Sequence, residues 1–460
     1  MFALDVTDPA SFGTSSLLWE FNSTVDPDMG RFTGIPSPPT LTADGKWVAA
    51  FGNGYNGAGN RAKLFVVDLS TGSKISVDAI TDSANAAPNG LSTATIIDAT
   101  GTCPSGGPPV CSDGVGDTIY AGDYLGNVWK FVLTKGAWKL NPSTPIFKAV
   151  DTYGHKQPIT SGMYAIKNPL GGVIIYFGTG KYLTTADNDP KDLQADGKPL
   201  VNSIYAVWDN GGSAAPTRSD LQQQRITDYT SGSFTITQNA FGYKTTEFPG
   251  GKMGWYLDLS VTSANPDPLQ SERVLAAPTG VLSKLFINVF RPIGDICLPA
   301  GVNSLLELDL LNGGAAFPNP AGGGNGSGSG SGKGGQDIGD GPPLGSPNPV
   351  VTISGQTGIP AIGCPPGNPN CVTPHFWCTP GVPGYPNCAD PTWCQPSTPG
   401  YPNCPAPADC HPAIAGPPAQ PASPGYPYCN QSAQCSLIPN AGTPIGNQAF
   451  QCRAAWRQLR

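Results

Sequence analysis

The sequence has little charge, no excess of basic residues and no long apolar segment. Only 12% of its 460 residues are charged, and 32 acidic residues against 25 lysines and arginines give a formal net charge of −7. Nucleic-acid-binding domains normally present a basic face, so this balance argues against DNA or RNA as a partner. No apolar run reaches the length of about 20 residues that a membrane-spanning helix needs. We therefore expect neither a nucleic-acid partner nor a transmembrane segment.

The common signatures of catalysis are also missing. The three histidines form neither a metal-binding pair nor part of a Ser/His/Asp order, and no glycine loop of the phosphate-cradling type is present. One segment, Phe65–Gly72, resembles the Asp-x-x-Thr-Gly turn of quinoprotein dehydrogenase propellers. The same turn occurs in non-enzymatic propellers. We therefore expect a protein that is not an enzyme, with a quinoprotein-like enzyme as the alternative.

Glycine and proline are abundant, at 60 and 50 residues, and they separate short strand-like runs up to about Leu311. These runs are rich in β-branched and aromatic residues, as in Lys63–Leu69, Gly172–Gly178 and Leu285–Phe290. No stretch shows the 3.6-residue period of an amphipathic helix over ten or more residues. The pattern predicts an all-β domain.

Some of the runs are related to one another. Phe2–Thr7, Phe65–Ser70 and Trp255–Ser260 share the order aromatic, apolar, apolar, Asp, apolar, Ser or Thr, and Tyr205–Asp209 is a looser relative. Recurring strand–Asp–turn units are typical of propeller blades. We therefore favour a β-propeller, and a β-sandwich is the alternative that the pattern leaves open.

Composition divides the chain into segments. We expect the β-propeller to cover residues 1–320, followed by a flexible Gly/Ser-rich linker over 321–346. Residues 347–363 look extended and are expected to return to the propeller. Residues 364–452 form a cysteine-rich module with repeated Pro-Gly-Tyr-Pro turns and little regular structure, and 453–460 are a terminal tail with a tryptophan.

The thirteen cysteines and the low charge suit an oxidising compartment, so we expect part of a longer, exported protein. No spacing is Cys-x₂-Cys, which disfavours zinc and favours structural disulfides. Cys103 with Cys111, and Cys364 with Cys371, are expected to close short loops. In the repeats, pairing across the Pro-Gly-Tyr-Pro turns and pairing across the five-residue gaps are both allowed. The first scheme leaves Cys297 alone and pairs Cys378–Cys388, Cys394–Cys404, Cys410–Cys429 and Cys435–Cys452.

The strongest candidate for a metal site is Asp113–Asp117, in which two carboxylates bracket a glycine turn. Short strands expected at Thr118–Ala121 and Val128–Val132, with turn residues between them, predict a hairpin directly after it. Ca²⁺ takes several oxygens from a short loop with glycine at the bend. The alternative is a turn with two solvated aspartates. Asp26–Asp28 and Asp187–Asp192 are weaker candidates, and for these we favour solvated acidic turns.

Several segments resemble the C-terminal domain of PilY-type proteins, which are tip-associated adhesins and biogenesis factors of type IV pili. They include Met1–Thr7, Leu18–Phe21, Trp47–Tyr55, Tyr120–Phe131, Tyr176–Leu183, Tyr205–Asp209 and the terminal Ala455–Leu459. The resemblance follows the chain in order to about Gly313 and resumes at its last residues. It implies a modified β-propeller, and because the chain begins part-way into the family's propeller, we expect an incomplete one.

The resemblance also implies a function. It places the domain outside the cell at the pilus tip, where it would mediate surface adhesion and help to balance pilus extension against retraction. The implied partners are minor pilins and other tip proteins, together with a host or abiotic surface. The alternative is a structural platform for minor pilins without direct adhesion.

The resemblance further implies Ca²⁺ as a cofactor, because in this family a calcium loop precedes the Tyr-Ala-Gly-Asp strand. Asp113 and Asp117 match the second half of that loop, Val115 would offer its backbone carbonyl, and Asp98 would supply the opening ligand. The segment Cys103–Cys111 lies between Asp98 and Asp113 and departs from the family's pattern. Calcium would order this loop and so set the affinity of the propeller for its pilus partner.

Overall fold

The computed structural model describes residues 1–31, 35–75, 77, 88–100, 113–212, 214–261, 264, 266–294, 301–318, 330–347, 350–351 and 357–358. The chain divides into two units, Met1–Ser346 and Pro347–Arg460. The described residues contain no α-helix and four short 3-10 helices, Pro9–Ser11, Thr14–Ser16, Thr185–Asn188 and Arg218–Asp220. In this part of the chain no helix has the length and apolarity to span a membrane. The all-β prediction is confirmed.

The first unit begins with three small antiparallel sheets. The first is the hairpin β1 (Phe2–Leu4) and β2 (Leu17–Glu20), and the second is formed by β3 (Thr40–Leu41), β4 (Trp47–Gly52) and β5 (Leu64–Asp68). The third has the order β10–β8–β7–β6, with β9 also paired to β8; its strands are β6 (Thr95–Ile97), β7 (Thr118–Gly122), β8 (Asn127–Thr134), β9 (Ala137–Leu140) and β10 (Phe147–Lys148). β7 and β8 are the predicted hairpin.

An eleven-stranded sheet follows, in the order β11-β12-β13-β16-β14-β15-β21-β19-β18-β17, with β20 also paired to β21. Its strands are β11 (Tyr164–Lys167), β12 (Val173–Gly178), β13 (Ser203–Asp209), β14 (Gln222–Thr230), β15 (Ser233–Gln238), β16 (Gly254–Asp258), β17 (Thr279–Val281), β18 (Lys284–Pro292), β19 (Gly301–Asp309), β20 (Phe317–Pro318) and β21 (Gly330–Gly341). All of its pairs are antiparallel except β14–β16. In the second unit, β22 (Val350–Val351) pairs with β23 (Thr357–Gly358).

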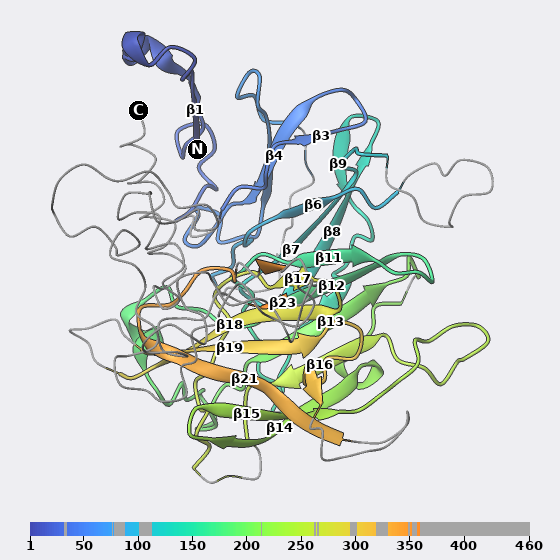
Figure 1. The fold of residues 1–460 in the computed structure, drawn as a ribbon. Coiled ribbons are helices and arrows are strands. Elements are labelled where there is room, and N and C mark those ends of the chain that lie inside the picture. The colour runs from blue at the N-terminus through green and yellow to red at the C-terminus, as the bar shows by residue number, and fades with distance from the viewer. Residues whose placement is uncertain are drawn as a thin grey trace, which may run out of the picture. The chain divides into compact units, whose positions relative to one another are not determined.

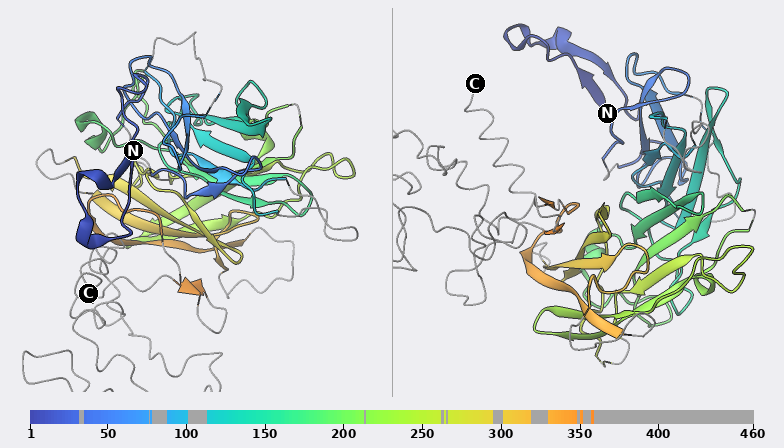
Figure 2. Two further views of the ribbon diagram at one scale, coloured as in Figure 1. Left: turned by 90° about the horizontal axis from the view of Figure 1, so that it is seen from above. Right: turned by 45° about the vertical axis from the view of Figure 1, so that its right-hand side comes forward.

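Within the first unit the sheets succeed one another in chain order, as the colours in Figures 1 and 2 show. This succession is that of a propeller, but the large sheet joins strands that separate blades would keep apart. The joins are the parallel β14–β16 pair and β21, which pairs with both β15 and β19. The prediction of a modified β-propeller is confirmed.

The predicted flexible linker over 321–346 is wrong where β21 lies. A β-carbon on Gly334 would lie 2.4 Å from Cδ1 of Ile236, and one on Gly335 would lie 2.4 Å from Cδ2 of Leu306. Glycine therefore allows β21 to pass close to both neighbours. The composition indicates flexibility for an isolated segment, whereas here the open edges of β15 and β19 supply the hydrogen-bonding partners.

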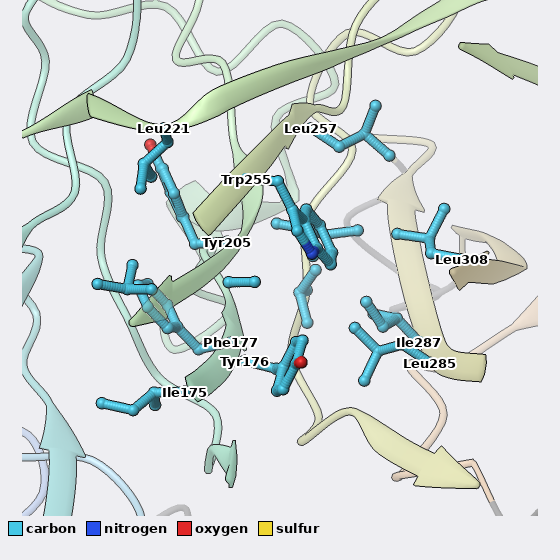
Figure 3. Packing of buried hydrophobic residues seen from close by; sticks show 14 of the residues in the cluster. Ile175, Tyr176, Phe177, Tyr205, Leu221, Trp255, Leu257, Leu285, Ile287 and Leu308 are labelled. Carbon is cyan, nitrogen blue, oxygen red and sulfur yellow. The ribbon is translucent and has the colours of Figure 1, made fainter. Parts of the chain in front are cut away.

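The largest core lies on the eleven-stranded sheet and is rich in aromatic residues (Figure 3). Phe177 and Tyr205 stack with ring centroids 5.3 Å apart, and Tyr176 lies 6.2 Å from Trp255. The Trp255 indole N–H donates to the carbonyl of Leu310 over 3.2 Å, so its one polar atom is satisfied in the core. Every residue of β12 is buried, which explains why its sequence is a continuous apolar run instead of an alternating one.

Candidate functional site

The predicted calcium loop lies at one end of the β6–β7 pair. Ile97 pairs with Thr118, so Asp98, which follows β6, and Asp117, which precedes β7, are brought opposite each other. Oδ2 of Asp98 accepts a hydrogen bond from the backbone N–H of Gly114 over 2.8 Å. The structure thus brings the expected opening ligand to the turn that carries the second half of the predicted site. The expected disulfide Cys103–Cys111 lies outside the described residues.

Asp117 holds the other side of the loop. Its Oδ1 accepts hydrogen bonds from the N–H of Ala99 over 3.0 Å and from the hydroxyl of Thr118 over 2.7 Å. Its Oδ2 accepts from the N–H of Thr100 over 2.8 Å and also from the Thr100 hydroxyl. Asp98 and Asp117 therefore form a reciprocal clamp, in which each carboxylate binds the backbone of the segment that carries the other.

The turn between them is built by a short side chain and two glycines. Oδ1 of Asp113 accepts from the N–H of Val115 over 3.0 Å, and Gly114 adopts a φ of +82°, which favours glycine. Gly116 donates its N–H to the carbonyl of Leu41 over 2.8 Å. A β-carbon on Gly116 would lie 2.5 Å from Cγ2 of Thr40, so this glycine is required by its approach to β3.

The oxygen-rich donor set fits a hard cation in its chemistry, but its arrangement is already satisfied by protein groups. Nζ of Lys167 lies 3.3 Å from Oδ1 of Asp98, and both oxygens of Asp117 accept hydrogen bonds. Among the described residues, no three acidic, histidine or cysteine side chains are placed to hold one metal ion. The four predicted ligands thus share one loop, and a cation there would have to displace Lys167 or backbone donors.

A second acidic group, Asp123 in the turn between β7 and β8, is fully buried. Its Oδ1 accepts from the N–H groups of Leu125 and Asn127, both over 2.9 Å. Its Oδ2 accepts from the indole N–H of Trp129 over 2.9 Å and from the side-chain amide of Asn89 over 3.1 Å. Our reading of the sequence treated this residue only as part of a turn. The spacing Asp-x₃-Asn-x-Trp could have indicated that Asp123 is the shared acceptor for Asn127 and Trp129.

The recurring aspartates at strand ends also make specific contacts. Asp258 at the end of β16 pairs with Arg218, whose Nη1 donates to the Tyr205 hydroxyl over 2.8 Å. Asp209 at the end of β13 accepts from the Tyr120 hydroxyl over 2.6 Å and lies 2.7 Å from Nζ of Lys130. The repeat therefore marks places where a carboxylate ties one strand to a neighbouring element.

The two weaker metal candidates are not solvated turns, contrary to our expectation. Asp187 is buried, accepts from the N–H groups of Leu183 and Thr184, both over 2.8 Å, and lies 2.8 Å from Nζ of Lys181. Burial raises the pKa of Asp187, but the hydrogen bond from Lys181 and the backbone N–H groups outweigh it and lower the pKa overall. Asp187 lies within the 3-10 helix Thr185–Asn188, and its carboxylate caps the N-terminal end of that helix.

The second weaker candidate, Asp26, is also buried, and it lies 2.8 Å from Nζ of Lys63 and 2.6 Å from Nζ of Lys74. Both lysines are more than 35 residues away in the sequence. Local composition could not reveal this pairing, because only the folded chain brings the charges together.

This chain is similar in sequence to a known protein family. The family described as "PilY1 beta-propeller domain" matches residues 1–145. The type IV pilus biogenesis factor PilY1 homolog of Xylella fastidiosa is 35% identical over 396 residues, which is 81% of this chain and 25% of that protein. The type IV pilus biogenesis factor PilY1 of Pseudomonas aeruginosa is 30% identical over 355 residues, which is 68% of this chain and 28% of that protein.

The fold agrees with the sequence comparison. The crystal structure of the Pseudomonas aeruginosa PilY1 C-terminal domain matches with a TM-score of 0.59 and 25% identity, over 77% of this chain and 75% of that chain. The chain spans about a quarter of the length of the curated relatives that it matches. It belongs to the PilY1 family and is homologous to the C-terminal β-propeller domain of PilY1.

Proposed function

We propose that this chain is the propeller domain of a type IV pilus biogenesis factor, and that it acts by binding other pilus proteins. The observation that carries the proposal is the 35% identity over 81% of the chain to a protein named as such a factor. The test is to delete residues 1–346 from the gene in its own organism and to count surface pili by electron microscopy. Loss of pili, restored by the intact gene, is the expected result. Unchanged pilus number and twitching motility would refute the assembly role.

Binding, in place of catalysis, is the second part of the proposal. The buried carboxylates of Asp123 and Asp258 hold a turn and a strand in place through hydrogen bonds and an ion pair. The quinoprotein-like alternative rests on the turn that ends in Gly72. In that turn Oδ1 of Asp68 accepts from the N–H of Ser70 over 2.9 Å, as in an ordinary Asx turn. The absorption spectrum of the protein purified from its own organism tests this point, since a bound quinone would favour the enzyme.

Adhesion at the pilus tip is the finer proposal for the exported protein. It rests on the aromatic residues of the cysteine-rich module, residues 364–452, which lie outside the described residues; the module contains Tyr385, Tyr401, Tyr426, Phe376, Trp377 and Trp393. Deleting residues 364–435 separates two roles. Normal pili with lost surface attachment would support adhesion by the module, whereas lost pili would support a platform for minor pilins. Unchanged attachment with normal pili would refute both roles for the module.

We also propose that Ca²⁺ binds the loop of Asp98, Asp113 and Asp117, with the carbonyl of Val115, and that pilus extension and retraction are tuned there. The support is the sequence pattern and the contact of Asp98 with Gly114. The reciprocal clamp of Asp98 and Asp117 competes with cation binding, because protein donors already form hydrogen bonds with these carboxylates. A bound cation would supply positive charge that offsets the repulsion between the carboxylates.

Calorimetric titration of Ca²⁺ into the oxidised protein tests this proposal, with Asp113→Ala/Asp117→Ala as the variant. Binding that vanishes in the variant is the expected result. The matched control is Asp187→Ala, in a loop where Lys181 neutralises the carboxylate, and it should leave the titration unchanged. Absence of binding heat and of any calcium-dependent shift in Tm in the parent would show that the clamp has replaced the metal.

A further inference from the structure

Glu272 is a buried carboxyl group that the fold leaves incompletely paired. Its side chain has no exposed surface, and its Oε1 has no hydrogen-bond partner among the described residues. Its Oε2 accepts a long hydrogen bond of 3.4 Å from Nη1 of Arg291, which also donates to the carbonyl of Pro268 over 2.6 Å. An ionised carboxylate is costly in such a place, because a buried charge needs full pairing. The protonated acid is therefore the form that suits this site.

Arg291 connects Glu272 to the glycine-rich strand β21. Nη2 of Arg291 donates to the hydroxyl of Tyr229 on β14 over 3.2 Å, and the guanidinium carbon lies 5.4 Å from the centre of that ring. The Tyr229 hydroxyl donates in turn to Oδ2 of Asp337 on β21 over 2.5 Å. Oδ1 of Asp337 accepts from the hydroxyl of Ser304 on β19 over 2.7 Å. A chain of hydrogen bonds thus runs from the buried acid to β21.

β21 has little besides backbone pairing and this anchor to keep it in the sheet. It lies between β15 and β19 (Figure 1), and six of its twelve residues are glycine. Ile338 is its one apolar side chain apart from glycine, and it is partly buried. Among the described residues, Asp337 is the residue of β21 whose side chain bonds to other strands. A strand with few buried contacts opens locally more readily than its neighbours, so the state of Asp337 decides how firmly β21 is held.

One arginine serves two carboxylates in this network. Arg291 attracts both Glu272 and Asp337, and the two carboxylates repel each other when both are ionised. With Glu272 protonated, the positive charge of Arg291 balances Asp337. With Glu272 ionised, the group carries a net negative charge in a poorly solvated place. Part of that repulsion acts on β21, because Asp337 belongs to it.

The other charged groups near Glu272 do not supply the missing positive charge. Arg273 lies 3.4 Å from Asp192, so its charge is balanced there. Asp267 accepts hydrogen bonds from two backbone N–H groups and adds to the negative potential at Glu272. Tyr229 stays neutral, because burial raises its pKa. Ionisation of Glu272 therefore leaves a buried negative charge without a partner.

We propose that Glu272 is a proton-operated latch that holds β21 in the sheet when protonated and releases it when ionised. In the protonated state Arg291 supports Asp337 through Tyr229. When Glu272 gives its proton to water, both arms of the Arg291 guanidinium turn to the new carboxylate, which binds them more strongly than a hydroxyl does. Asp337 then loses its support and is repelled, so β21 separates locally from β15 and β19. This inference concerns the chain alone and does not rest on the proposed function.

Hydrogen–deuterium exchange of the full chain, read by mass spectrometry at pH 6 and pH 9, tests the latch. Each rate is divided by the intrinsic exchange rate at the same pH, which gives the protection factor of each segment. Burial raises the pKa of Glu272 to about 8, although Arg291 opposes this shift, so the latch is closed at pH 6 and open at pH 9. We expect the protection of residues 330–341 to fall by about tenfold or more at pH 9. The protection of the fully buried strand β12 should change by less than about twofold.

Glu272→Gln keeps a neutral side chain at both pH values, so β21 should be equally protected at pH 6 and pH 9. Asp337→Ala removes the anchor and should lower the protection of β21 already at pH 6. The matched control is Glu307→Gln. Glu307 is also a partly buried glutamate whose pKa is raised by burial, but it lies on β19 near Lys284, at 3.8 Å. This control should keep the parent's loss of protection at pH 9.

Four results would overturn the latch. The first is no fall in the protection of β21 in the parent, and the second is an equal fall in β12, which would mean a loss of global stability instead of local release. The third is a fall that persists in Glu272→Gln, and the fourth is a fall that disappears in Glu307→Gln. The exchange assay needs no pili, so its outcome is independent of the assembly role.

Discussion

Replacing Asp123 by alanine should destabilise the propeller more than any exposed substitution. The variant removes the acceptor of five donors: the backbone N–H groups of Leu125 and Asn127, the side-chain amides of Asn127 and Asn89, and the indole of Trp129. Asn89 is 1% exposed and Trp129 is 8% exposed, so these donors cannot turn to bulk water in the folded state. A buried donor left without a partner costs about 1–3 kcal/mol. Because the small cavity admits some relaxation, we expect a total loss of about 4 kcal/mol.

Equilibrium unfolding of the full chain in guanidinium chloride, followed by far-ultraviolet circular dichroism, measures this loss as a lower midpoint with an unchanged slope. The matched control is Asp68→Ala, which removes a carboxylate from the same strand–Asp–turn pattern. The hydrogen bond from the N–H of Ser70 to Asp68 is exposed to solvent. Asp68→Ala should lower the free energy of unfolding by about 0.5–1 kcal/mol, since water replaces the lost acceptor. A loss below about 1 kcal/mol for Asp123→Ala, or equal losses in both variants, would refute the assigned role of the buried turn.

Three further predictions concern stability. Burial raises the pKa of Glu272 to about 8, although the nearby Arg291 opposes this shift, so the free energy of unfolding falls as the pH rises from about 4.5 to about 8. Glu272→Gln should abolish up to about 4 kcal/mol of that fall between pH 5 and pH 8. Parallel curves of unfolding free energy against pH for the parent and the variant would contradict this prediction. Burial raises the pKa of Asp26, but the hydrogen bond from Lys63 outweighs it and the pKa drops to about 2. The ionised carboxylate therefore stabilises the fold above pH about 4, and this contribution is lost toward pH 2. Asp26→Asn should lower the free energy of unfolding by about 2 kcal/mol at neutral pH and flatten the acid-unfolding curve. Gly335→Ala should cost about 2 kcal/mol in urea unfolding because its β-carbon meets β19, whereas Gly250→Ala, with open space around it, should be neutral, and equal midpoints would argue against β21.

The sequence by itself determined the local structure. Aromatic and β-branched runs such as Tyr205–Asp209 form strands because their side chains pack on a pleated, buried surface. The turn residues after Gly122 correctly predicted the β7–β8 hairpin, since that turn is closed by contacts at most six residues apart. The order of recognisable segments also identified the family and its propeller.

Only the tertiary structure decided which groups far apart in the sequence meet. β21 is glycine-rich and has the composition of a flexible linker, yet it forms a strand because it pairs with the edges of β15 and β19. Asp26 became a buried ion-pair partner through Lys63, 37 residues away. Asp98 and Asp117 became a mutual clamp, although their residue types alone suggest a cation. The physical reason is the same in each case: local propensity is a short-range free energy, whereas pairing, burial and neutralisation depend on partners that only the folded chain supplies.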